Sequence, residues 1–121
     1  MLAGMSDAST VAGLFARRAR ERGGRVEARR ASVSGALPAL VALLVARGVR
    51  RVWLFGSFAW GGAHEGSDVD LAVEGLPADA LWPAQGQLLG AAPCSVDLVR
   101  IEEAPPALAS RIRGKGRLLY G

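Results

Sequence analysis

Two aspartates one residue apart, Asp68 and Asp70, have the spacing in this sequence that most directly suggests chemistry. They lie in an apolar run that continues to Val73, and side chains alternate across a strand, so both carboxylates should project from the same face. Both should be ionised at pH 7, because the reference pKa of aspartate is about 3.9, and two such charges repel each other. A cation between them would remove this repulsion, so the pair predicts a metal site.

A glycine-serine pair precedes these aspartates. Gly56-Ser57 directly follows the apolar run 51–55, and ten residues separate Ser57 from Asp68. A turn of this kind can present backbone N–H groups and a hydroxyl to phosphate, helped by a following helix N-terminus. Oxygen ligands next to a phosphate-holding backbone favour Mg²⁺ carrying a nucleotide.

A third carboxylate, Asp97, lies in a later strand-like run between Val96 and Leu98. These two apolar residues would share one face of the strand, and Asp97 would lie on the other. If this strand pairs beside the one that carries Asp70, Asp97 stands next to Asp70 and completes a cluster of three carboxylates. A carboxylate on a buried strand needs a partner, so the cluster strengthens the prediction of a metal site.

An amphipathic helix should precede the first strand and cover the sheet. We expect it to begin at a cap on Ser34 or Gly35, with Pro38 near its start, and to end at Arg47-Gly48. Its apolar residues recur at helical spacing: Leu37, Leu40, Val41, Leu44 and Val45.

The remaining patterns predict three strands and two further helices. The strands are expected at 51–55, 68–73 and 95–99, the helices at 78–89 and 102–113, and a short closing strand or tail at 115–120. Leu81, Leu88 and Leu89 should form the buried side of the first of these helices. The three tryptophans, Trp53, Trp60 and Trp82, are expected in the core, and Trp60 is close enough to Gly56-Ser57 to border a nucleotide.

Composition indicates one compact domain in a reducing compartment. The chain has 121 residues, 50% of them apolar, and a single cysteine, Cys94, which excludes an intramolecular disulfide and a multi-cysteine metal site. We therefore expect a cytoplasmic protein. No apolar stretch is expected to be long enough to span a membrane.

Charge is unevenly distributed along the chain. Residues 1–51 contain ten arginines and three acids, a net charge of +7, whereas residues 52–121 contain five basic and eight acidic residues, a net charge of −3. We divide the chain into a basic N-terminal arm or helix, 1–33, and a domain, 34–121. The arm could dock on RNA, DNA or an acidic partner, or could be a solvated, partly frayed helix.

The central stretch resembles the minimal nucleotidyltransferases (MNT) of the DNA polymerase β-like nucleotidyltransferase superfamily. The similarity rests on Gly56-Ser57, the ten-residue gap, Asp68-x-Asp70 and the later Asp97, and extends over roughly residues 37–120. The resemblance implies an α+β fold with a small mixed sheet packed by helices. It also implies that Gly56 and Ser57 hold the triphosphate, that all three aspartates bind Mg²⁺, with two ions expected, and that they are catalytic. Family members often carry arginine in the segment after Gly-Ser, and here Trp60 takes that place.

The resemblance implies transfer of AMP from ATP to a hydroxyl group. Minimal members frequently act as antitoxins of HEPN ribonuclease toxins, so the acceptor would be a tyrosine of such a toxin, bound in a hetero-oligomer. Two alternatives stay open. The acceptor could be a small molecule or an RNA 3′ end, or the domain could neutralise a toxin by binding alone.

Overall fold

The fold is seen in a computed structural model that describes residues 24, 27–63 and 68–121. Its centre is a four-stranded sheet with the order β3-β2-β1-β4. The strands are β1 Arg51–Phe55, β2 Val69–Glu74, β3 Val96–Arg100 and β4 Arg117–Tyr120. β1 pairs antiparallel with both β2 and β4, whereas β2 and β3 are parallel. The sheet is therefore mixed, and the expected α+β class is confirmed.

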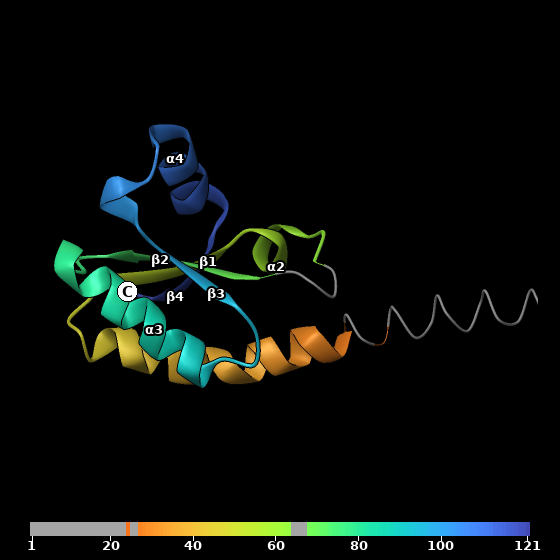
Figure 1. Ribbon diagram of the computed structural model, residues 1–121. Coiled ribbons are helices and arrows are strands. Elements are labelled where there is room, and N and C mark those ends of the chain that lie inside the picture. Colours follow the sequence, from red (N-terminus) through yellow and green to blue (C-terminus); the bar gives the residue numbers. More distant parts are fainter. Residues whose placement is uncertain (1–23, 25–26, 64–67) are drawn as a thin grey trace, which may run out of the picture.

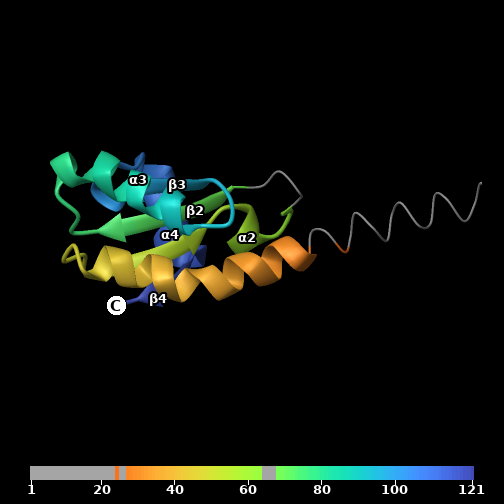
Figure 2. The same cartoon turned by 60° about the horizontal axis from the view of Figure 1, so that its bottom comes forward.

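Helices cover the two faces of the sheet unequally (Figures 1 and 2). The long helix Glu27–Val45 and α3, Leu81–Ala91, lie on one face, and α4, Pro106–Lys115, lies on the other. The short helix α2, Ser57–Trp60, follows β1. Two 3₁₀ turns, η1 Ala78–Ala80 and η2 Ile101–Glu103, precede α3 and α4.

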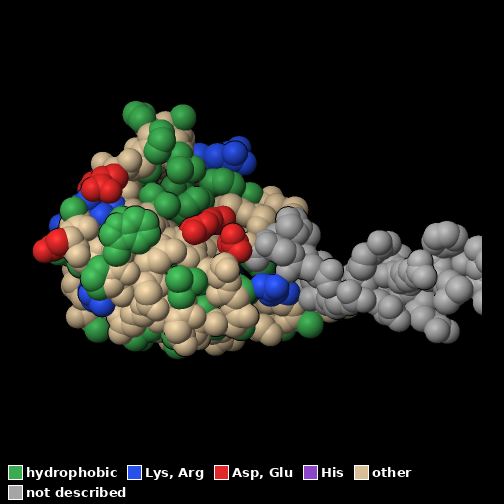
Figure 3. All heavy atoms as spheres, in the orientation of Figure 1, with side chains coloured by type: hydrophobic (Ala, Val, Ile, Leu, Met, Phe, Trp, Pro, Cys, Tyr) green, Lys and Arg blue, Asp and Glu red, His purple; other side chains and the backbone are tan. Residues whose placement is uncertain are grey.

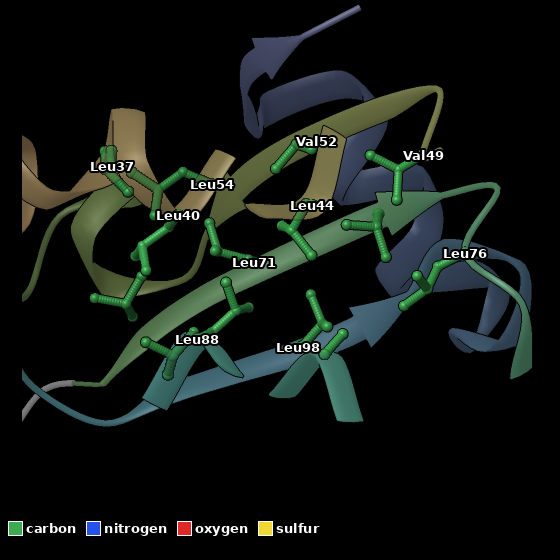
Figure 4. Close-up of a cluster of buried hydrophobic side chains, with 14 of the residues drawn as sticks. Leu37, Leu40, Leu44, Val49, Val52, Leu54, Leu71, Leu76, Leu88 and Leu98 are labelled. Carbon is green, nitrogen blue, oxygen red and sulfur yellow. The ribbon is translucent and has the colours of Figure 1, made fainter. Parts of the chain in front are cut away.

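The main core lies between the sheet and the two helices on its first face (Figure 4). Alternate residues of the strands point into it, including Leu54, Leu71 and Leu98, and they meet Leu40 and Leu88 from the two helices. These side chains are at most 6% exposed, so this face is sealed from water. Most of the stability of the sheet should come from this burial, at about 25 cal/mol per Å² of apolar surface.

The second face of the sheet carries a smaller apolar cluster under α4. Trp53, Phe55 and Ala72 of the sheet pack there against Ile112 of α4. The other alternate residues of β2 and β3, namely Asp70, Glu74 and Asp97, also point to this side, as the pleat requires. The expectation that Asp70 and Asp97 point away from the apolar residues next to them in each strand, which lie in the main core, is therefore confirmed.

Polar contacts secure the edges of the sheet. Gln85 of α3 donates from Nε2 to the carbonyl of Val96 at 2.7 Å and accepts from the N–H of Leu98 at 2.9 Å, which satisfies the outer edge of β3. Glu74 at the end of β2 accepts from Arg51 at 2.6 Å and from Arg113 at 2.9 Å. The hydrogen bond from Arg113, together with Arg51, lowers the pKa of Glu74.

Three local expectations were wrong. The first helix does not begin at Ser34 or Gly35 but is already helical at Glu27, so Pro38 lies inside it. Burial of Val33 in the core explains this, because the added helical residues cover more of the sheet. Trp82 is 76% exposed and Leu89 is 45% exposed, since α3 turns Ala84 and Leu88 toward the sheet instead.

The division into an arm, 1–33, and a domain, 34–121, stays a prediction. Most of the arm, residues 1–23, 25 and 26, lies outside the described residues, and its last residues belong to the continuous first helix.

The helix Glu27–Val45 is long and apolar enough to cross a membrane by length and composition, contrary to the expectation that no such stretch exists. Its 19 residues reach a mean hydropathy of 1.3. Four of its apolar residues are buried against the sheet, Val33, Leu37, Leu40 and Leu44, and core helices of globular domains meet the same criterion. The absence of a membrane partner stays a prediction.

The two hydrogen bonds of Gln85 should stabilise the β3 edge. We expect Gln85→Ala to lower the free energy of unfolding by about 1–2 kcal/mol, because it leaves Val96 and Leu98 without their side-chain partner. The matched control is Gln87→Ala, which removes only an exposed contact with Arg47 and should change stability by less than about 0.5 kcal/mol. Urea unfolding of both variants measures this, and equal losses would contradict the role of Gln85.

Candidate functional site

The parallel register of β2 and β3 brings two of the predicted carboxylates together. Asp70 pairs directly with Asp97, between the apolar pairs Val69–Val96 and Leu71–Leu98. Both side chains leave the sheet on the face that α4 covers only in part. Asp70 is half-buried and Asp97 is exposed. The expectation that Asp97 stands next to Asp70 is confirmed.

Asp68 lies one residue before β2 and is exposed. Burial, then the charge of Asp97 and then that of Asp68 together raise the pKa of Asp70 to about 6. At pH 7 Asp70 is still largely ionised, as the sequence suggested, but at the cost of repulsion from both neighbours. All three carboxylates therefore act on one region of the surface.

Gly56 allows Asp70 to occupy this position. A Cβ atom on Gly56 would lie 2.1 Å from Oδ2 of Asp70, and its φ of +76° is rarely adopted by other residues. The turn between β1 and α2 therefore passes directly against the Asp70 carboxylate. Phe55, the preceding residue, is paired with Asp70 across β1 and β2. The glycine of the Gly-Ser pair is thus required by contact with the carboxylate as well as by the turn.

Ser57 is the first residue of α2, and Trp60 is the last. The backbone N–H of Trp60 donates to the carbonyl of Gly56 at 2.8 Å, and its indole Nε1 donates to the carbonyl of Lys115 at 2.9 Å. The ring of Trp60 also packs against Phe55, with centroids 5.9 Å apart. Trp60 is therefore partly buried beside the turn and fixed at both ends.

The guanidinium of Arg111 lies over the Trp60 ring, 4.0 Å from its centroid. No pattern in the sequence indicated this contact, because Arg111 is fifty-one positions away and comes from α4. Figure 3 shows acidic side chains gathered at the centre of this face, with apolar side chains between them and basic side chains beside α4.

The donor set fits a magnesium ion in its chemistry. The carboxylates offer oxygen ligands only, and a cation would relieve the repulsion that raises the pKa of Asp70. Among the described residues, no three acidic, histidine or cysteine side chains converge on one point. Asp68 is exposed and would turn toward Asp70 and Asp97 to share an ion with them.

Polar residues outside this group of carboxylates have structural roles or lie elsewhere. Arg100 donates to the carbonyl of Leu76 at 2.6 Å and pairs with Glu103, so its charge is already engaged. His64 lies outside the described residues. Two hollows occur between the first helix and β4, lined in part by Leu37 and Arg117, on the side of the sheet opposite to the carboxylates.

Substituting Gly56 should displace the Asp70 carboxylate. We expect Gly56→Ala to lower the melting temperature more than Gly61→Ala, because both glycines have positive φ but only Gly56 would bring a Cβ against a side chain. The difference should be about 1–2 kcal/mol in the free energy of unfolding. Calorimetric melting of both variants measures it. Equal losses of stability in the two variants would mean that the structure relieves the contact between the new Cβ and Asp70 at no cost in free energy.

The raised pKa of Asp70 predicts how stability depends on pH. Between pH 3.8 and about 6 the folded protein binds more protons than the unfolded chain, so stability should fall as pH rises through this window and then level off. Without divalent cations, Asp70→Asn should therefore be more stable than the wild type at pH 7–8, by about 1 kcal/mol after allowance for partial exposure, and should match it below pH 4. Asp79→Asn, at an exposed position, serves as control. Urea unfolding across this pH range, in the presence of a chelator, should show the gap only for Asp70→Asn.

Known proteins are similar to this chain in sequence. Residues 40–121 match the family described as polymerase beta, nucleotidyltransferase. Protein adenylyltransferase MntA of Shewanella oneidensis is 36% identical over 75 residues, which make up 58% of this chain and 52% of that protein. The chain therefore spans about half the length of this curated relative.

Solved structures have the same fold. A chain in a crystal structure of a toxin–antitoxin with AMP-PNP is 31% identical, with a TM-score of 0.60, over 67% of this chain and 69% of that chain. A structure of the tri-AMPylated Shewanella oneidensis HEPN toxin in complex with MNT antitoxin gives 26% identity and a TM-score of 0.59, over 73% and 71% of the two chains. The resemblance to minimal nucleotidyltransferases is thus confirmed, and the chain belongs to the polymerase beta nucleotidyltransferase family.

Proposed function

We propose that this protein is a Mg²⁺-dependent nucleotidyltransferase that transfers AMP from ATP to a hydroxyl of a protein partner, as the antitoxin of a HEPN-type toxin. The observation that carries the proposal is the pairing of Asp70 with Asp97 on adjacent parallel strands, with Gly56 in contact distance of Asp70. The named function of the relative MntA, a protein adenylyltransferase, supports the reaction class.

The reaction joins the acceptor oxygen to the α-phosphorus of ATP and breaks the bond between that phosphorus and the bridging oxygen, so that pyrophosphate leaves. The acceptor hydroxyl must lose its proton. We assign this proton to Asp97, which is exposed and lies on β3, at the edge of the sheet. Asp97 would hand the proton on to water afterwards.

The carboxylates would also hold the metal. Asp68, Asp70 and Asp97 would together hold the two ions that we propose, with Asp70 next to Asp97 in the sheet. When bound, Mg²⁺ neutralises the negative charge on the reacting phosphate. Gly56 and Ser57 would hold the β- and γ-phosphates through the backbone of the turn and the Ser57 hydroxyl.

The partner is proposed from related complexes. A neighbouring structure contains an AMPylated HEPN toxin with an MNT antitoxin, and another contains AMP-PNP. We extend both features to this chain, as a hetero-oligomer with a toxin in the cytoplasm. RNA binding by the basic residues 1–33 stays a prediction, as does the alternative that the acceptor is a small molecule or an RNA 3′ end.

A transfer assay tests the proposal. The protein is incubated with Mg²⁺, ATP labelled at the α-phosphate and the HEPN protein encoded beside it, and label on the toxin is measured. We expect transfer by the wild type and a loss of at least about a hundredfold in Asp70→Asn, because the central metal ligand is removed. Asp79→Asn should transfer normally.

A second label separates the alternatives. ATP labelled at the γ-phosphate should leave the toxin unlabelled, which excludes phosphoryl transfer. Unlabelled toxin in both assays, together with tight binding of the toxin, would favour the module that neutralises by binding alone. Label on added RNA or aminoglycoside instead of the toxin would favour the other acceptors.

A further inference from the structure

Two arginines of α4 contact tryptophans in the same way but differ in their charge partners. Arg113 lies over Trp53 at 5.2 Å and donates to Glu74 at 2.9 Å, so a carboxylate neutralises it. Arg111 lies closer over Trp60, at 4.0 Å, and no described carboxylate forms an ion pair with it. Arg111 therefore keeps an uncompensated positive charge on the face that carries the three aspartates.

Trp60 holds this charge beside the glycine-serine turn. Its indole N–H is bound to the carbonyl of Lys115, and its backbone N–H is bound to that of Gly56. With Phe55 packed against one part of the ring, Trp60 has little freedom to rotate. The guanidinium of Arg111, which lies over this ring, is therefore held beside the turn.

The neighbouring contacts lead from this guanidinium to the carboxylates. Phe55 touches Trp60 and is paired with Asp70 in the sheet. Arg111, Trp60, Phe55 and Asp70 therefore follow one another as neighbours, with the cation at one end and the carboxylate at the other. Figure 3 shows basic, apolar and acidic side chains on this face of the molecule.

An anion that meets this face would find the guanidinium of Arg111, which no described carboxylate neutralises. A nucleoside triphosphate adds negative charge to a face that already holds three aspartates, and the metal ions offset only part of it. A guanidinium that is held over an aromatic ring and not by a carboxylate keeps N–H groups available, and it can donate two of them to a phosphate.

We propose that Arg111 binds the phosphate chain of the nucleotide and that Trp60 is the residue that positions it. The inference rests on the proposed function, because it assumes that a nucleotide binds at the carboxylates. It names the cation that the sequence alone did not provide, since Trp60 itself has no charge.

Calorimetric titration with Mg²⁺-ATP and with adenosine tests this proposal. We expect Arg111→Gln to weaken ATP binding roughly tenfold or more, as the loss of a charge-assisted hydrogen bond implies, while adenosine binding is unchanged. Arg111→Lys should bind ATP with intermediate affinity. Arg113→Gln is the matched control, because it removes an arginine of the same helix that also lies over a tryptophan, and its ATP affinity should equal that of the wild type.

Each outcome decides between the two proposals. Failure of the wild type to bind Mg²⁺-ATP would overturn the proposed function. Binding by the wild type with equal affinity in Arg111→Gln would overturn the role of Arg111 alone. A parallel loss of ATP and adenosine would also overturn it, because it would mean that Arg111 only supports the Trp60 ring. Should Arg111→Gln unfold, Arg111→Lys gives the same comparison of the two ligands.

Discussion

Repulsion between Asp70 and Asp97 is the constraint on which the site depends, and the parallel pairing of β2 and β3 creates it. Parallel neighbours need a crossover, which α3 supplies, and the same helix satisfies the edge of β3 through Gln85. The apolar residues that alternate with these aspartates hold the register, because a slip by one residue would bury the carboxylates among leucines. The core therefore holds the carboxylates of Asp70 and Asp97 next to each other, although their like charges repel.

The surroundings of Asp70 determine how much its pKa is raised. Its carboxylate is half-buried between the turn at Gly56 and the apolar cluster under α4, so water screens it less than it screens Asp97 or Asp68. The result is a pKa of about 6, low enough to leave a ligand ionised at neutral pH and high enough to favour a cation. The uneven cover of the sheet, sealed on one face and partly open on the other, produces this intermediate state.

Local pattern was enough to predict the strands and the pair Asp70–Asp97, because strand alternation and apolar flanks determine which face each residue takes. It was not enough for the outer surfaces. Trp82 and Leu89 are apolar but exposed, since burial depends on how α3 meets the sheet and not on residue type. The start of the first helix was wrongly expected at Ser34 or Gly35, because a proline usually marks a first turn. Here the helix begins further toward the N-terminus, since Val33 is buried in the core.

The distribution of cations could not be read from the sequence either. Fourteen of the fifteen basic residues are arginine, so residue type does not distinguish them; only their partners do. Three of them, Arg50, Arg51 and Arg113, surround Glu74 at one end of β2, and Arg100 is held by Glu103. Arg111 instead rests on an aromatic ring, which holds a guanidinium in place without cancelling its charge. In a face dominated by aspartates, an aromatic support is therefore a means of keeping one cation both ordered and available to an anionic ligand.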